Sequence, residues 1–226
     1  MPHHNRVDPW GDLHVVPSRG LFTGNRGCLV DDAGTLVRHH NGSLWIICRT
    51  EYRGWKHPLT AARTWTPLFF LDDAVALAAG HRPCGLCRRN DYLAYRDAVS
   101  TVVAAGRTVL APELNRRLAA ERHRRGRGLI RSKDRILWVS PLDALPAGTV
   151  IIDPTTHWPH LVTGSRLQRF GFDGWGPPND PPRDTEVKVL TPPTSVAALI
   201  NGFVPRLHPT AGNDLPGPQQ RTPPPT

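Results

Sequence analysis

Residues 78–92, AAGHRPCGLCRRNDY, place two cysteines between an alanine-rich segment and a run of arginines and polar residues. The segment before them, residues 71–79, has carboxylates in its first turn and is followed by Gly80. Carboxylates suit the first turn of a helix and glycine suits the position after its end, so this pattern predicts a short helix. We therefore expect Cys84 and Cys87 in a tight loop directly after a helix.

A C-x-x-C pair is found in zinc sites, in redox-active sites and by chance. Redox pairs normally open a helix after a strand, where the helix dipole lowers the thiol pKa. Because Cys84 and Cys87 come after a helix that ends at Gly80, zinc is favoured. The chain starts without a secretory signal, which predicts a cytoplasmic protein whose reduced cysteines are ligands or nucleophiles.

Tetrahedral zinc needs four ligands, and the C-x-x-C pair provides two of them. Cys48, at the end of the apolar run LWII, is the expected third ligand. Small cysteines are often simply buried and loop histidines are often solvated, so the fourth position stays open. Its candidates are Cys28, which we adopt as the working choice, His57, His81 and a residue that the sequence does not identify.

The charge of the chain points to a polyanionic partner. Its 226 residues include 28 Lys+Arg against 19 Asp+Glu, a net charge of +9, and nearly all of the positive charge is arginine, which pairs with phosphate through two parallel hydrogen bonds. Residues 115–135 are the most basic segment, which is typical of a solvated helix face or of an element that follows phosphates. No apolar window approaches the length of a membrane span, so no membrane is expected.

Two segments resemble a known family. LFFLDDAVALAAGHRPCGLCRRND, with the preceding LWIICRTEY, is similar to the zinc-binding methyl-acceptor domain of the Ada family of bacterial alkylation-response proteins. The similarity covers about residues 35–92 and leaves the rest of the chain unrecognised. In that family four cysteines bind zinc, and the first of them accepts a methyl group from a DNA methylphosphotriester.

The resemblance implies a role for each matching residue. Cys84 and Cys87 match the last two ligands, and Cys48 matches the first, which is also the nucleophile. The second ligand position falls on Tyr52, and a phenol is a poor zinc ligand. A zinc site with one thiolate replaced by a neutral histidine carries less negative charge, which lowers the expected nucleophilicity of its sulfurs.

Together these patterns predict an α+β fold with four parts. The first, residues 1–105, is a small Ada-like zinc lobe of short strands and helices, including a helix over residues 90–105. A basic linker of helix or loop, residues 106–135, follows it. Residues 136–208 form a second small β-rich lobe with a terminal helix, and residues 209–226 form a disordered proline-rich tail.

The expected function is a zinc-containing DNA-binding protein, linked to DNA alkylation repair or a damage response, with DNA preferred over RNA. Its salt-sensitive phosphate contacts are expected from two groups of arginines. They are Arg49, Arg53, Arg82, Arg88 and Arg89 around the cysteines, and Arg124, Arg125 and Arg127 in the basic run.

The alternative is a nucleic-acid-processing enzyme of the nuclease or glycosylase type. Its acids and bases would come from His39-His40-Asn41 and from DPTTHWPH, Asp153 to His160, which offers a carboxylate and two imidazoles. Catalysis would thus be either stoichiometric methyl transfer to Cys48 or hydrolysis of nucleic acid.

Overall fold

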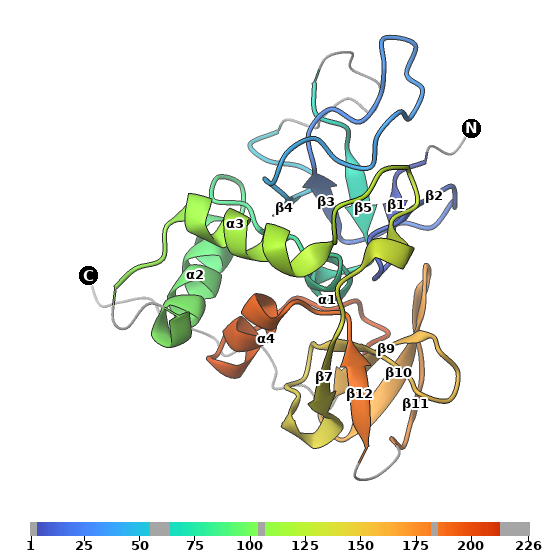
Figure 1. The fold of residues 1–226 in the computed structure, drawn as a ribbon, viewed down its shortest axis with the longest axis vertical. Helices are drawn as coiled ribbons and strands as arrows, with labels where there is room; N and C mark the ends of the chain where they lie inside the picture. The colour runs from blue at the N-terminus through green and yellow to red at the C-terminus, as the bar shows by residue number, and fades with distance from the viewer. Residues whose placement is uncertain (1–3, 55–63, 104–106, 182–184, 213–226) are drawn as a thin grey trace.

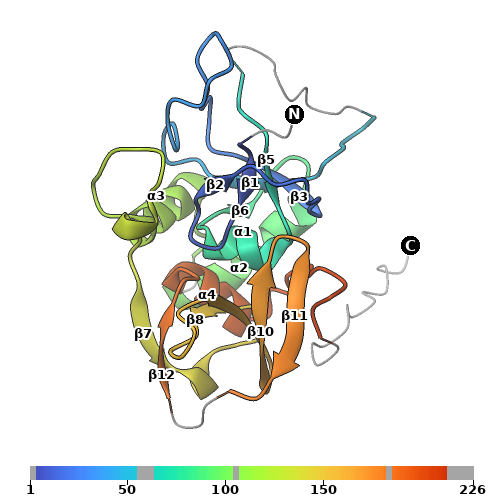
Figure 2. The same cartoon turned by 90° about the vertical axis from the view of Figure 1, so that its right-hand side faces the viewer.

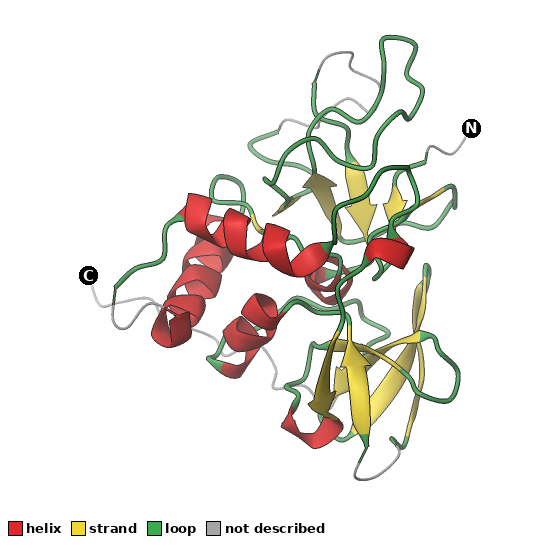
Figure 3. Ribbon diagram, viewed as in Figure 1, coloured by secondary structure: helices red, strands yellow, loops and turns green. Residues whose placement is uncertain are grey.

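The computed structural model describes residues 4–54, 64–103, 107–181 and 185–212. Within them the chain forms two six-stranded sheets and four α-helices (Figures 1 and 3). The expected α+β class is confirmed. The tail from residue 213 lies outside the described residues. No helix in the described part of the chain is both long and apolar enough to cross a bilayer.

The first sheet has the strand order β2-β1-β5-β3-β4-β6. β4 is central to the site because it pairs antiparallel with β3 and parallel with β6. In the loop between β3 and β4, Val30 and Leu36 form an isolated bridge. The bounds are β1 Arg6–Val7, β2 Leu13–His14, β3 Phe22–Asn25, β4 Ile46–Cys48, β5 Leu68–Phe70 and β6 Arg82–Pro83.

Helices α1, α2 and α4 follow the sequence signals closely, and α3 forms within the expected basic linker. α1, Asp73–Ala78, starts at an N-cap where the carboxylate of Asp72 accepts a hydrogen bond from the backbone N–H of Val75. Gly80 ends this turn with a φ of 84°, a left-handed conformation that favours glycine. The other helices are α2 Arg89–Val103, α3 Ala111–Arg122 and α4 Pro193–Ile200, with short 3₁₀ turns η1 Ser132–Asp134 and η2 Leu142–Ala144.

The second sheet is antiparallel throughout, with the order β11-β10-β9-β8-β12-β7. The β-rich character expected for this region is observed. Strand β11, with the sequence GWGPPN, lies at the sheet edge, where proline is tolerated. The bounds are β7 Trp138–Pro141, β8 Val150–Ile152, β9 Pro159–Thr163, β10 Arg166–Gly171, β11 Gly174–Asn179 and β12 Glu186–Val189.

Helix α1 lies between the two sheets and is buried along its whole length (Figures 1 and 2). It contacts β5 of the first sheet and β8 of the second, and one hydrophobic core includes residues of both. The carboxylate of Asp72 also accepts a hydrogen bond from the indole N–H of Trp175 in β11, 2.6 Å away. The segment that ends in the cysteine pair is therefore fixed from both sides.

Candidate metal centre

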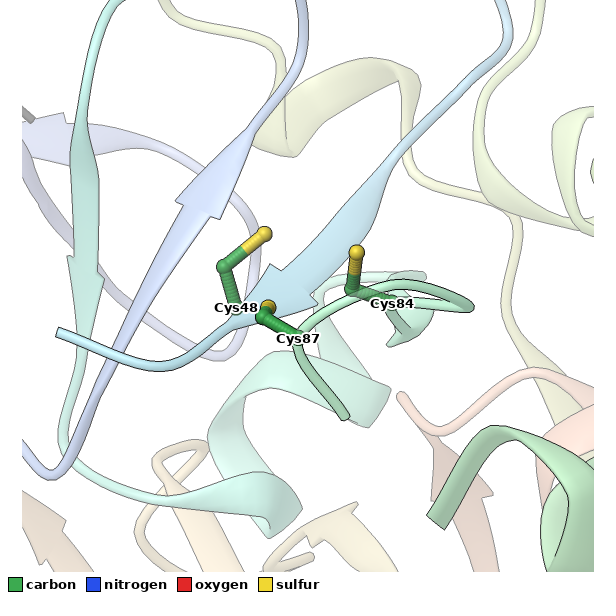
Figure 4. A group of neighbouring side chains, drawn as sticks. All are labelled: Cys48, Cys84 and Cys87. Atoms are coloured by element: carbon green, nitrogen blue, oxygen red, sulfur yellow. The ribbon is translucent and has the colours of Figure 1, made fainter. Parts of the chain in front are cut away.

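Strand pairing brings Cys48 to the cysteine pair. β4 and β6 run parallel with Ile46 opposite Arg82 and Ile47 opposite Pro83. The backbone N–H of Cys84 then donates to the carbonyl oxygen of Ile47 at 2.9 Å, so the loop after β6 starts beside the end of β4. Figure 4 shows the three side chains gathered where the two strands end.

The three sulfurs, of Cys48, Cys84 and Cys87, all lie within 4.8 Å of one another. Cys48 and Cys84 are buried and Cys87 is partly buried. Zinc–sulfur bonds of about 2.3 Å in a tetrahedron place the sulfurs about 3.8 Å apart. The group is thus compact enough to hold a metal ion after a small contraction.

Backbone amides point at two of the sulfurs. The N–H of Leu86 donates to Sγ of Cys84 and the N–H of Arg49 donates to Sγ of Cys87, each at 3.4 Å. Such bonds favour the ionised sulfur and orient it, as outer hydrogen bonds do at metal sites. The loop therefore has a shape suited to thiolates.

The thiols also act on one another. Hydrogen bonds from Cys48, and then from Cys87, lower the pKa of the Cys84 thiol. The same bond to Cys84 raises the pKa of the Cys48 thiol, since Cys48 keeps its proton as the donor. The group thus holds one thiolate readily, and thiolate is the form that binds a soft metal ion.

The fourth ligand is not among the expected residues that the structure describes. The thiol of Cys28 donates to the carbonyl oxygen of Val30 at 3.4 Å, and Cys28 is not part of the three-sulfur group. Cys28 starts the turn that leads to the Val30–Leu36 bridge, which explains its separate position. His81 is fully buried, and its Nε2 accepts a hydrogen bond from Arg26 at 3.1 Å. His57 lies outside the described residues.

The arginines expected to contact DNA fall into two classes, exposed and buried. Arg49, Arg53 and Arg89 are exposed, with the guanidinium of Arg53 over the ring of Tyr52 at 5.3 Å. Arg124, Arg125 and Arg127 are exposed as well.

Arg82 and Arg88 are buried, at 4% and 3% exposure. Arg82 donates to the side chain of Asn115 in α3, while Arg88 forms an ion pair with Asp73 at 2.5 Å and lies over Phe22. Arg88 is neutralised by its ion pair and Arg82 is held by hydrogen bonds to Asn115 and to a backbone carbonyl, so both are parts of the fold and not of a DNA-contacting surface.

The residues of the enzyme alternative have structural partners. The carboxylate of Asp153 accepts hydrogen bonds from the backbone of Thr155 and from the backbone and hydroxyl of Thr156, which makes it the cap of a turn. Burial, and then the charge of Arg26, lowers the pKa of His39 to about 2. A histidine with so low a pKa is a poor proton acceptor near neutral pH.

The chain matches no family model, no curated protein and no solved structure. The Ada-type resemblance therefore stays a prediction based on the residues quoted above. The arrangement of the three cysteines is the observation on which a functional argument can be built.

Proposed function

We propose that this protein is a zinc-containing DNA-binding protein associated with DNA alkylation repair or a damage response. The observation that carries the proposal is the group of Cys48, Cys84 and Cys87, whose sulfurs lie within 4.8 Å of one another. Backbone N–H groups donate hydrogen bonds to two of these sulfurs. The link to alkylation damage comes from the Ada-type resemblance alone.

The donor set favours zinc. Cysteine thiolates select soft or borderline ions, and structural zinc in proteins is commonly bound by three or four cysteines. Bound here, zinc would join the end of β4 to the loop that leads into α2. The fourth ligand stays open: of the candidates named from the sequence, His57 lies outside the described residues, and solvent is the alternative.

The exposed arginines support a nucleic-acid partner. Arg49 and Arg89 flank the cysteine group in sequence, and both are exposed. Their charges are part of the net charge of +9 that the chain carries. Guanidinium groups that meet phosphates release counterions, so binding should weaken as salt increases. We expect DNA binding without strong sequence preference, because these contacts involve the backbone of the nucleic acid.

The test is the salt dependence of DNA binding, measured by fluorescence anisotropy with a labelled duplex and a labelled single strand. Replacing Arg124, Arg125 and Arg127 with alanine should reduce the slope of log K against log salt by about two to three units, if each arginine meets one phosphate. A matched control removes three exposed charges from the second sheet, at Arg166, Arg169 and Lys188. Equal slopes for the two variants, or no binding by the wild type, would contradict the proposal.

Methyl transfer to Cys48 stays a prediction of the resemblance. Cys48 is 9% exposed, and its neighbour in sequence, Arg49, is exposed. The measurement is mass spectrometry of the zinc-loaded protein after incubation with DNA that carries methylphosphotriesters. A single added methyl group on Cys48 would establish the reaction, whereas an unmodified thiol with zinc still bound would leave a binding function alone.

A further inference from the structure

A basic cavity of about 400 Å³ lies away from the cysteines. One wall comes from the loop before β4, with His40, Ser43 and Trp45. The other comes from the end of α3 and the loop that follows, including Arg122, His123 and Arg131. Helix α3 lies beside the first sheet in both views of the fold (Figures 1 and 2). The volume is in the range of small-ligand sites.

Three guanidinium groups are buried in and behind this wall. Arg26, Arg122 and Arg135 are 0%, 3% and 4% exposed, and within the described ranges none of them has an ion pair. Their hydrogen bonds go mainly to backbone carbonyls: Arg122 donates to Gly80 and Ser43, at 3.2 and 3.1 Å. Buried charges are normally paired, so this concentration of positive charge is unusual.

The nearby carboxylates that the structure describes form no ion pair with these three groups, although Asp8, Asp12 and Glu121 lie close enough to favour their charged forms. Asp134 pairs with Arg131 at 2.7 Å, and Asp12 accepts the backbone N–H of Arg131 and of Ser132. Burial, and then the charge of Arg135, lowers the pKa of Arg122 to about 9, so its guanidinium stays positive near neutral pH. With Arg124 and Arg125 on the rim, guanidinium groups still outnumber the carboxylates around the cavity.

The histidine in the wall has an unused polar atom. Nε2 of His123 is buried and has no hydrogen-bond partner among the described residues. Burial, and then the charge of Arg135, lowers the pKa of this ring, so the imidazole is neutral and able to donate one N–H. A buried polar atom without a partner is costly, and a small turn of this cavity-lining ring would bring Nε2 to an anion that accepts its hydrogen bond.

We propose that this cavity binds a phosphate monoester, the terminal phosphate of a nucleotide or of a nucleic-acid end. Guanidinium groups match phosphate oxygens in geometry and charge, and the cavity is larger than a phosphate ion, which leaves room for the attached group. The proposal goes beyond the proposed function: the cysteines do not line the cavity, and only Arg124 and Arg125 on its rim are shared with the DNA-binding argument.

Trp45 limits what the cavity can recognise. The guanidinium of Arg26 lies over this indole at 4.1 Å and that of Arg122 at 3.9 Å, and the side chain is 2% exposed. The ring is thus occupied by cation–π contacts and is not available for stacking with a base. Recognition is expected to depend on the phosphate and to tolerate any base.

The test is isothermal titration calorimetry on the full chain with adenosine 5′-monophosphate, inorganic phosphate and adenosine. We expect the first two to bind and adenosine not to bind. His123→Phe keeps the ring volume and removes the donor, so it should weaken binding of the monophosphate about tenfold, the worth of one hydrogen bond to a charged group. Replacing Arg124 and Arg125, on the exposed rim, with alanine should also weaken it.

Two controls keep the result interpretable. The pair Arg166→Ala and Arg169→Ala removes the same charge from the second sheet and should leave the affinity unchanged, and thermal melting checks that each variant is folded. Equal binding of adenosine and its monophosphate, or an unchanged affinity in folded His123→Phe, would overturn the proposal.

Binding of oligonucleotides with a 5′-phosphate or a 5′-hydroxyl distinguishes the two sources of the phosphate, a free nucleotide and a nucleic-acid end. Stronger binding of the phosphorylated strand identifies a nucleic-acid end, and equal binding of both strands assigns the site to free phosphomonoesters. Phosphate binding without any DNA binding would end the proposed function and keep this inference. DNA binding by a protein that binds neither phosphate nor the monophosphate would overturn this inference and keep the proposed function.

Discussion

The two ends of the strand pair β4 and β6 gather groups of opposite character. At the carboxyl end, Cys48, Cys84 and Cys87 bring together sulfurs that favour a cation. At the amino end, Trp45 is covered by buried guanidinium groups that favour an anion. A strand advances about 3.3 Å per residue, so Trp45 and Cys48 are separated by only about 10 Å.

The partners of the buried arginines differ between the two ends. Arg88, next to the cysteines, has two carboxylate partners, Asp73 and Asp91. Arg122, at the other end, has carbonyl oxygens instead. The same residue type therefore completes the fold at one end and leaves charge for a ligand at the other, and only its partners distinguish the two roles.

The largest expected effect comes from removing the metal at the cysteine end. Binding of structural zinc contributes on the order of 10 kcal/mol of apparent free energy, so a chelator should unfold residues 20–95. Circular dichroism and thermal melting measure the loss. Cys84→Ser should behave like the chelated protein. Cys28→Ser should melt close to the wild type, because the thiol of Cys28 lies outside the three-sulfur group and donates to the carbonyl oxygen of Val30.

The second effect tests the paired arginine. Asp73→Asn removes the carboxylate charge that faces the buried guanidinium of Arg88, so the free energy of unfolding should fall by about 3–5 kcal/mol. Asp91→Asn is the matched control, since Asp91 faces the same guanidinium at 2.7 Å but its side chain is 45% exposed. Exposed pairs contribute about 1 kcal/mol or less. Equal losses in urea unfolding would contradict the assignment of Arg88 to the core.

The third effect is a pH dependence located between the two sheets. Burial raises the pKa of Asp72 from 3.8 to about 6, against three hydrogen bonds that lower it. The folded state therefore binds this proton more tightly than the unfolded state, and the stabilisation is fully present below pH 3.8 and lost as pH rises through 6. A shift of this size corresponds to up to about 3 kcal/mol.

Asp72→Asn isolates this contribution. The difference in unfolding free energy between wild type and variant should increase as pH falls from 7 to 4. A difference that is constant with pH would show that the carboxyl group of Asp72 does not titrate in this range.

The smallest effect compares two glycines, one near each end of β6. A Cβ on Gly80, where φ is 84°, would lie 2.3 Å from Cδ of Arg122, while a Cβ on Gly85 would meet only ordinary contacts with Tyr92 at 3.5 Å. Gly80→Ala should cost about 1–2 kcal/mol and weaken phosphate binding by displacing the guanidinium. Gly85→Ala should be close to neutral. An unchanged phosphate affinity in Gly80→Ala would show that Arg122 does not contribute to phosphate binding in the cavity.

The sequence was informative where structure is local. The helix end at Gly80 and the C-x-x-C loop depend on neighbouring residues, and both are confirmed. The position of Cys48 was also predictable, because an apolar run that ends in cysteine fits a buried strand that ends at the site. Sequence patterns of this kind act over a few residues, which is the range of capping and turn preferences.

The basic cavity could not be found in the same way. Arg26 meets His81 across 55 positions of sequence, and its surroundings read as an ordinary glycine-rich turn. The burial of Arg82 and Arg88 was missed because charged residues are usually exposed and the pairing with Asp73 is a tertiary contact. His123 gave no local signal at all, since its role depends on how α3 packs against the loop before β4.

The measurement that tests the account most directly is the metal content of the purified chain, by elemental analysis, beside Cys84→Ser and Cys28→Ser. We expect about one zinc per chain in the wild type and in Cys28→Ser, because Cys28 lies outside the three-sulfur group, and a loss of zinc in Cys84→Ser. Wild-type protein that is folded and free of metal, or zinc that is lost with Cys28 and kept without Cys84, would contradict the central claim.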